Sequence, residues 1–402
     1  MPSESRNGPR FLIYSHDTFG LGHFRRCLKI ARKLTSHSTS ASVLLLTGSP
    51  LAHRFELPPR VDFVKLPSVV KTGVDLYSAR NVDMDIKDLI ALRSALIEAA
   101  VKQFAPDLFL VDHVPLGLQG EIQNVLAQLR TSGGVLTAVG LRDIIDEPEW
   151  VISRWRASGV MDALTRYYDM VVVYGQPEVY DTVREYQLPA DVTYVGYLAG
   201  ASVEDTGHPD CAPLRRPRVL VTVGGGEDGQ EVVKTYLEML RSHPAVVGFD
   251  TVLLPGPLLP AGECDRITRE SSGLPVEVQP FADDVPALMR MSDLVISMGG
   301  YNAVAEILGS ASRAILIPRE YPRREQLIRA QRLAQLGAVR VITQGELTAT
   351  RLLAEITSSL AQPESPLANM RRQGRIRIDG AARMATLLLE AVAHRKTKEV
   401  AS

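Results

Sequence analysis

The chain alternates short apolar runs with longer amphipathic segments over most of its length. Apolar runs of roughly four to eight residues bounded by turn residues are typical of buried strands, whereas apolar positions that repeat at the helical period predict helices. In the first half this rule predicts strands at 11–15, 41–46, 61–66, 106–112, 135–141 and 170–174, and helices at 22–35, at 86–104 and in the segment ending at Arg130. Such alternation favours a parallel sheet covered by helices on both faces.

Residues 196–217 break this alternation, because Gly, Ala, Ser, Pro and charged residues replace the apolar runs, as in a linker. A second series follows, with strands expected at 218–223, 249–254, 276–279, 294–297, 314–317 and 338–342 and helices at 230–241, 285–291, 302–308, 324–336 and 381–396. The pattern predicts an α/β chain with two Rossmann-like parallel-sheet domains, residues 1–200 and 201–375, facing a central cleft. Residues 376–402 are expected to form a C-terminal helix that packs back on the first domain.

Length and composition agree with this division. A chain of 402 residues is long for one hydrophobic core, and its net charge of −1 argues against a strongly basic nucleic-acid-binding protein. Its three cysteines, Cys27, Cys211 and Cys264, lie in no metal-ligand spacing and are typical of a reducing compartment. The polar N-terminal segment and the lack of an apolar run of about 18–20 residues predict a cytoplasmic protein with at most peripheral membrane contact.

The most informative motif follows the strand predicted at 294–297. Met298, Gly299 and Gly300 form a turn, and a helix is expected from Asn302 onward. A glycine turn that opens a helix brings backbone N–H groups and the positive helix end against an anion. Glu306 lies one turn further on the same helix face as Asn302 and is the only charge in an apolar segment. A carboxylate there can accept both hydroxyls of a ribose.

Two further glycine loops each follow a predicted strand. Gly224, Gly225 and Gly226 lie between a strand and a helix, which indicates contact with phosphate or a close approach of the two domains. In the first domain, Gly22 precedes His23 at the start of a helix, whose positive end favours the neutral imidazole that a general base needs. Asp112, at the end of its strand, is preferred as the carboxylate that orients His23, and Asp17 is the alternative.

These residues resemble the GT-B superfamily of glycosyltransferases, and most of all family 28, whose type member adds N-acetylglucosamine to the lipid precursor of peptidoglycan. The segment from Gly300 to Glu306 is also similar to a Gly-Trp-Asn-Ser-x-x-Glu motif of plant glycosyltransferases. The resemblance implies a nucleotide-sugar donor site whose residues divide by role. The diphosphate would contact Gly299, Gly300 and Asn302; the ribose Glu306; the sugar Glu325 and Gln326; and the base Phe281 and Ala282. Gly22, Gly224, Gly225, Gly226 and Met298 are further candidates for binding the donor nucleotide-sugar.

The sequence also departs from the family pattern. Leu21 separates two glycines that are usually adjacent before the histidine, and Ala303 replaces the usual Ser or Thr. The run Arg25-Arg26-Cys27-Leu28 resembles the UDP-sugar hydrolases of pseudaminic-acid and related pathways. On the acceptor side, Arg142 and Asp143 follow a strand of the first domain and are expected to reach the cleft.

The sequence therefore predicts an inverting, metal-independent glycosyltransferase with His23 as base. It would move a sugar from a nucleoside diphosphate, UDP before dTDP or GDP, to a hydroxyl or amine of a small-molecule or lipid-linked acceptor. No cofactor and no metal site are expected, since no carboxylate-rich cluster is visible. A nucleotide-sugar hydrolase, an epimerase and a non-catalytic nucleotide-sugar-binding protein are the alternatives, and the oligomeric state stays open.

Overall fold

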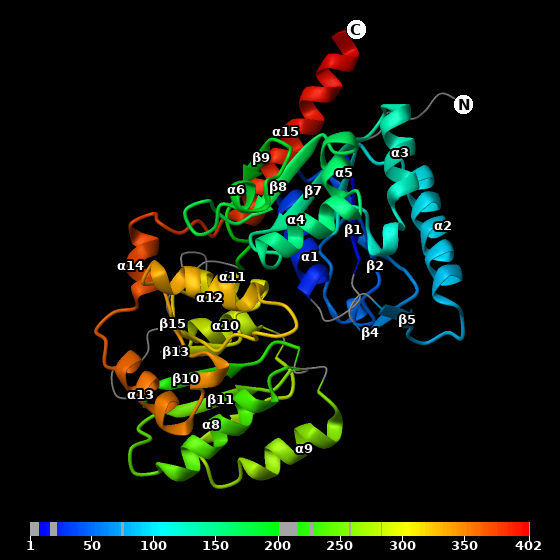
Figure 1. Cartoon of the computed structure of the whole chain (residues 1–402). Helices are drawn as coiled ribbons and strands as arrows, with labels where there is room; N and C mark the ends of the chain where they lie inside the picture. The colour runs from blue at the N-terminus through cyan, green and yellow to red at the C-terminus, as the bar shows by residue number, and fades with distance from the viewer. Residues whose placement is uncertain are drawn as a thin grey trace.

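The computed structural model describes residues 8–16, 22–73, 76–200, 216–225, 228–256, 259–282 and 284–401. Two parallel sheets, each flanked by helices, form two domains one above the other in Figure 1. This confirms the predicted fold class.

The first sheet has the strand order β3-β2-β1-β6-β7-β8-β9. Its strands are β1 (Arg10–Ser15), β2 (Ser42–Thr47), β3 (Val61–Lys65), β6 (Leu108–Asp112), β7 (Leu136–Arg142), β8 (Met170–Tyr174) and β9 (Val192–Tyr194). The helices around it are α1 (Gly22–His37), α2 (Ile86–Phe104), α3 (Gln123–Ser132), α4 (Pro148–Ala157), α5 (Val160–Arg166) and α6 (Thr182–Tyr186), with short 3-10 turns at Ala52–Arg54 and Leu118–Gly120. Residues 11–14 of β1 and 108–112 of β6 are fully buried, as expected for central strands covered on both faces.

The second sheet has the order β12-β11-β10-β13-β14-β15. Its strands are β10 (Arg218–Thr222), β11 (Asp250–Leu254), β12 (Val276–Val278), β13 (Leu294–Ser297), β14 (Arg313–Leu316) and β15 (Arg340–Val341). The helices are α8 (Gln230–Ser242), α9 (Ala261–Glu270), α10 (Val285–Arg290), α11 (Tyr301–Ser310), α12 (Glu325–Gln335) and α13 (Ala349–Leu360), and a 3-10 turn spans Gln344–Glu346.

The periodicity analysis did not predict α9, α13, α14 (Pro366–Arg372) or the antiparallel hairpin of β4 (Val69–Gly73) and β5 (Leu76–Ala79). α9 has a mostly polar sequence in which Ile267 is the buried apolar residue, so it carries little of the periodic signal that marks a helix. The hairpin lies in a connection between two strands of the first sheet and pairs with itself rather than with that sheet.

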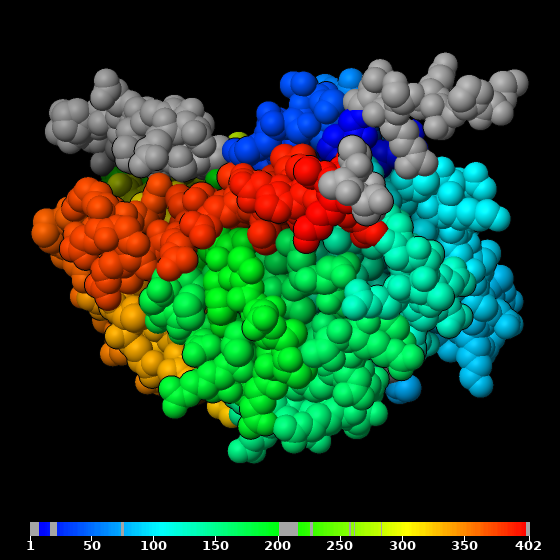
Figure 2. All heavy atoms as spheres, turned by 90° about the horizontal axis from the view of Figure 1, so that it is seen from above, coloured from blue at the N-terminus to red at the C-terminus, as the bar shows by residue number. Residues whose placement is uncertain are grey.

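The last helix, α15 (Gly380–Ala401), returns to the first domain and packs along α1. Figure 2 shows it lying across the first domain, with the second domain at one side. Its start is fixed by the end of the first domain, since the Gly380 N–H donates to the Tyr197 carbonyl at 3.1 Å. A Cβ at Gly380 would lie 2.5 Å from the Gly196 carbonyl oxygen, so only glycine allows this approach.

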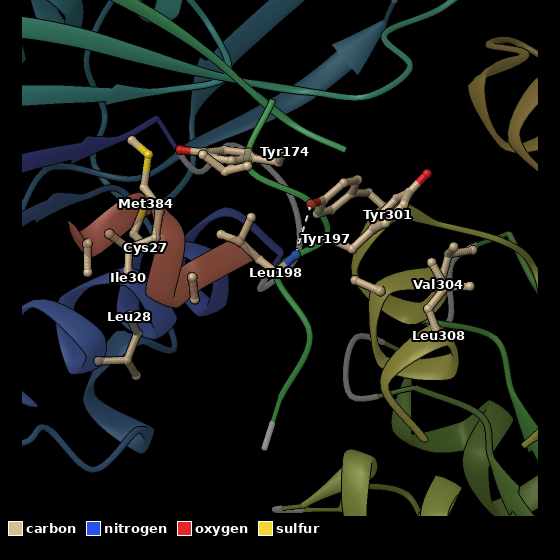
Figure 3. Close-up of a cluster of buried hydrophobic side chains, with 14 of the residues drawn as sticks. Cys27, Leu28, Ile30, Tyr174, Tyr197, Leu198, Tyr301, Val304, Leu308 and Met384 are labelled. Carbon is tan, nitrogen blue, oxygen red and sulfur yellow. Dashed lines mark hydrogen bonds between the residues drawn. The ribbon is translucent and has the colours of Figure 1, made fainter. Parts of the chain in front are cut away.

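A hydrophobic cluster joins the two domains. Figure 3 shows its side chains reaching from α1 and α15 on one side to α11 on the other, with Tyr197 and Leu198 between them. Tyr301, the first residue of α11, lies 6.2 Å from the ring of Tyr197 and accepts a hydrogen bond from the Leu198 N–H at 3.4 Å. The carboxyl ends of the central strands of both sheets therefore lie at a packed domain interface.

Candidate active site

His23 and Asp112 meet at the carboxyl edge of the first sheet. His23 lies in the first turn of α1 and Asp112 is the last residue of β6, and the His23 Nδ1 is 2.6 Å from the Asp112 Oδ2. Burial by itself raises the pKa of Asp112, but Arg26 and His23 outweigh it and hold this pKa well below its usual range. An ionised carboxylate only accepts hydrogen bonds, so we assign the proton to Nδ1 and the basic lone pair to Nε2; Arg26 Nη2, 2.9 Å from Nδ1, then donates to Asp112. Asp17, the alternative partner, lies outside the described residues.

Arg26, which the sequence analysis did not single out, anchors this pair. Its Nε donates to Asp112 Oδ1 at 2.8 Å and its Nη2 to Asp112 Oδ2 at 2.5 Å, a bidentate geometry. The guanidinium carbon lies 5.6 Å from the ring centre of Tyr174 and 5.3 Å from that of Tyr301, which comes from the other domain. We call His23, Asp112 and Arg26 the base cluster. Its sequence clue was the spacing of His23 and Arg26, which places both on one helix face.

Two more histidines surround His23. His16 follows β1, and its ring centre is 4.3 Å from that of His23 in an edge-on arrangement. His113 follows Asp112, and its ring centre is 5.6 Å away. Burial is the main cause that lowers the pKa of both rings well below the usual value, so both are neutral at neutral pH. The sequence analysis did not assign His16 a role, although it follows a predicted strand.

The turn predicted to bind the diphosphate, Met298–Gly300, is called the donor turn here. Gly299 has φ of 79°, which favours glycine, and Gly300 is the N-cap of α11. The turn faces the first domain, since the Asn302 Nδ2 donates to the Gly22 carbonyl at 2.9 Å. The structure thus brings the loop that contains Gly22 into direct contact with the helix that follows the donor turn.

Glu306 faces the same side as Asn302 but is paired across the interface. Its buried Oε1 lies 3.3 Å from the Lys29 Nζ and 3.4 Å from an Arg25 nitrogen, both on α1. In the described structure the carboxylate is therefore held by two cations of the first domain. Its predicted contact with a ribose stays a prediction.

Glu325 and Gln326 begin α12 beside the donor turn. Arg319, which follows β14, donates to Glu325 Oε1 at 2.6 Å and, through its backbone N–H, to Gln326 Oε1 at 3.1 Å. Arg319 also reaches Asp228, after β10, at 2.6 Å. A Cβ at Gly299 would lie 3.7 Å from the Gln326 carbonyl oxygen, so the turn and α12 are close neighbours. From the sequence, Arg319, Arg323 and Arg324 cluster beside Glu325, with one of them a candidate donor contact and the others expected to be solvated.

The other predicted donor residues lie around the same sheet edge. Gly224, with φ of 70°, and Gly225 follow β10, the strand beside β13, whereas Gly226 lies outside the described residues. Phe281 follows β12, and 40% of it is exposed; Ala282 next to it is partly buried. An exposed aromatic ring at this edge is available for stacking on a base.

Arg142 and Asp143, the predicted acceptor residues, divide in the structure. Asp143 is fully buried and pairs with Arg329 of α12 in the second domain, with Nη2 to Oδ1 at 2.8 Å. Arg329 also donates to the Gly299 carbonyl at 3.1 Å. Asp143 therefore belongs to a domain contact, while Arg142 lies beside His113, with Nε to Nε2 at 3.1 Å.

The described residues include no group of three or more His, Cys, Asp or Glu side chains arranged to hold a metal ion. Among the same residues, no helix combines the length and the apolar character needed to span a membrane.

Known proteins resemble this chain in two ways. Residues 219–385 match the family model described as Glycosyltransferase family 28 C-terminal domain. The UDP-N-acetylglucosamine–N-acetylmuramyl-(pentapeptide) pyrophosphoryl-undecaprenol N-acetylglucosamine transferase of Sinorhizobium medicae is 37% identical over 133 residues, covering 32% of this chain and 34% of the relative. The enzyme of the same name from Chromohalobacter salexigens is 29% identical over 198 residues, covering 48% and 52%. The matched segments thus span about a third to a half of these relatives.

Solved structures match over nearly the whole chain. The glycotransferase of kitacinnamycin superposes with a TM-score of 0.65 at 19% identity, covering 96% of this chain and 100% of that one. MurG of Acinetobacter baumannii superposes with a TM-score of 0.59 at 14% identity, with the same coverage. At such identities the superpositions establish the fold. The chain therefore has the GT-B fold seen in glycosyltransferases, and its residues 219–385 are similar to the C-terminal domain of glycosyltransferase family 28.

Proposed function

We propose that this protein is an inverting glycosyltransferase that moves a sugar from a nucleoside diphosphate to a hydroxyl or amine of an acceptor. The observation that carries the proposal is the base cluster, with His23 Nδ1 held by Asp112 at 2.6 Å, facing the donor turn of the other domain. UDP is the favoured nucleotide, because the relatives that match the second domain are named as UDP-N-acetylglucosamine-dependent transferases.

His23 acts as the general base in this proposal. With the proton on Nδ1 and a carboxylate behind it, Nε2 takes the proton from the acceptor as its oxygen or nitrogen attacks the anomeric carbon. Asp112 stabilises the imidazolium that forms, and Arg26 keeps Asp112 ionised and fixed. Attack from the face opposite the leaving diphosphate inverts the anomeric configuration.

The second domain supplies the leaving-group side. Backbone N–H groups of the donor turn and the positive end of α11 stabilise the diphosphate as its negative charge grows. We propose that neither step uses a metal ion. By analogy with these relatives, we propose a small-molecule or lipid-linked acceptor. Contact of this chain with a membrane would be at most peripheral.

The first test is ligand binding followed by turnover. Thermal-shift titrations with UDP, dTDP and GDP identify the nucleotide, and UDP is expected to raise the melting temperature most. The matching nucleotide-sugar is then incubated with and without candidate acceptors, and the products are analysed.

Each outcome has a clear meaning. Acceptor-dependent release of the nucleoside diphosphate with inverted product supports the proposal. Release of free sugar without an acceptor makes the protein a hydrolase, and a changed sugar on an intact donor makes it an epimerase. Tight binding without consumption of donor under any condition rejects catalysis.

A further inference from the structure

Arg142 differs from the other inward-facing arginines at the core of the first domain and at the domain interface. Arg26, Arg93 and Arg329 each pair with a buried carboxylate, at 2.5 Å, 2.6 Å and 2.8 Å. Arg142 is partly buried at the end of β7, and in the described part of the chain no carboxylate lies within ion-pair distance of it. A guanidinium withdrawn from water without an anion is costly, so this position favours a negative ligand.

The charges around Arg142 strengthen this argument. Burial is the largest cause that lowers the pKa of Arg142, and the nearby cations Arg26 and Arg329 lower it further. Glu325 acts in the opposite direction, and the resulting pKa is about 10. Of the carboxylates nearby, Asp112 binds Arg26 and Glu325 binds Arg319 through Oε1, whereas the buried Oε2 of Glu325 has no hydrogen-bond partner among the described residues. The local excess of positive charge is therefore not cancelled by the described side chains.

The hydrogen bond between Arg142 and His113 fixes a second donor. Arg142 Nε donates to His113 Nε2 at 3.1 Å, so Nε2 is unprotonated and the neutral ring carries its proton on Nδ1. That Nδ1 is buried, with His113 only 7% exposed, and has no hydrogen-bond partner among the described residues. His113 also has φ of 68°, a strained value for a non-glycine residue that places its ring in this position.

His16 provides a second such group beside His23. Its side chain is 9% exposed, and its Nδ1 likewise has no hydrogen-bond partner among the described residues. The residues come from the ends of β1, β6 and β7, and β6 pairs with each of the other two strands. Buried polar atoms in proteins nearly always have partners, so two such atoms on rings that both neighbour His23 indicate a ligand position.

We propose that Arg142, His113 and His16 form a subsite for an anionic group of the acceptor, a carboxylate or a phosphate, beside the group that His23 deprotonates. The assignment to the acceptor rests on the proposed function and on place, because these residues belong to the first domain and the predicted donor residues belong almost entirely to the second. Arg142 Nε and Nη2 both contact His113 Nε2, which leaves Nη1 of the guanidinium, the His113 Nδ1–H and the His16 ring to bind the oxygens of such an anion. Acceptors that lack the anion would bind more weakly.

The test uses sulfate and acetate as probes on the full chain, with UDP present to occupy the donor turn and ionic strength held constant. The affinity is measured by calorimetry, and the imidazole nitrogen signals of His113 and His16 are followed by NMR. Wild type is compared with Arg142→Gln, with Arg142→Lys, which keeps the charge but not the fork, and with the exposed control Arg156→Gln.

We expect Arg142→Gln to weaken sulfate binding at least tenfold, Arg142→Lys to give an intermediate loss, and Arg156→Gln to match wild type. Tighter sulfate than acetate identifies a phosphate-type group, and the reverse order a carboxylate. Equal sulfate affinity in wild type and Arg142→Gln, or unmoved histidine signals, overturns the subsite. If Arg142→Gln fails to fold, wild-type sulfate affinity in Arg142→Lys together with unmoved histidine signals overturns it as well.

Failure of the subsite differs from failure of the function. Sulfate binding that depends on Arg142 in a protein that neither binds UDP nor consumes a nucleotide-sugar leaves the subsite and rejects the transferase. Donor turnover together with sulfate binding that does not depend on Arg142 supports the transferase and rejects the subsite.

Discussion

Each sheet has a crevice at the equivalent point of its topology, but different kinds of residues lie in the two crevices. Each sheet reverses its strand order beside its first strand, between β1 and β6 in one domain and between β10 and β13 in the other, and ligands of such folds bind at that point. In the first domain it holds His16, His23, Asp112 and His113. In the second it holds the glycines after β10 and the donor turn.

This difference separates two kinds of chemistry. Titratable side chains can take and return a proton but must be held by neighbours, as Arg26 holds Asp112. Glycine turns offer backbone N–H groups that need no proton balance and allow a close approach to phosphate. The side chains of α11 that could add charge, such as Glu306, instead contact α1 of the first domain.

The largest expected effect concerns the contact that keeps the two crevices face to face. Arg329→Met leaves Asp143 as an unpaired buried charge, so we expect a loss of about 3–5 kcal/mol in the free energy of unfolding. Denaturant unfolding measures it. The control is Arg332→Met on the same helix, whose pair with Glu185 is only partly buried and worth at most about 1 kcal/mol. Adding Asp143→Leu should restore part of the loss, and equal losses in the two single variants would contradict the assignment.

The next prediction tests the first crevice as the site of proton transfer. His23→Ala should lower turnover by about 10²-fold or more while nucleotide affinity stays near wild type, because the base and the donor turn lie on different domains. Turnover is measured with the donor found by the binding screen. His37→Ala, at the exposed far end of α1, is the matched control. Near-normal turnover in His23→Ala would remove His23 from the mechanism.

A smaller effect concerns the pH dependence of stability. His16 and His113 have lowered pKa values in the folded protein, so below a pH of about 6.5 the unfolded chain binds protons that the folded protein does not. Stability should therefore fall as the pH drops from 7.5 to 5.5. In the double variant His16→Gln, His113→Asn this fall should be about 2 kcal/mol smaller. Urea unfolding at both pH values measures it, with His37→Gln as control, and an unchanged fall would show that the two rings take up protons in the folded protein as readily as in the unfolded chain.

The smallest effect tests the second crevice. A Cβ at Gly300 meets no atom within 4 Å and the residue has φ of −60°, so Gly300→Ala should change stability by less than about 1 kcal/mol. The added methyl group faces the predicted phosphate position and should weaken UDP binding about tenfold, or about 1.4 kcal/mol. Calorimetry measures the affinity. Gly134→Ala, equally unhindered in the first domain, is the control, and wild-type UDP affinity in Gly300→Ala would place the diphosphate elsewhere.

Much of this architecture was predictable from local pattern. The strands at 170–174 and 294–297 and the helix at 86–104 have the predicted bounds, since apolar runs and helical periodicity depend on neighbouring residues alone. The donor turn was predictable for the same reason, because a glycine turn between a strand and a helix is a local requirement of the backbone. Unpredicted elements such as α9 lack that periodic signal.

The sequence by itself therefore determined the α/β class, the glycine turns and the strand ends that carry polar residues. Only the tertiary structure decided which of these residues meet. Asp112 contacts His23, which is 89 positions away in the sequence, and Asp143 binds Arg329, which is 186 positions away. Such pairings depend on strand order and on how the two domains close against each other. Spacing along the chain does not encode these distances, because residues at neighbouring strand ends are brought together by long crossover connections.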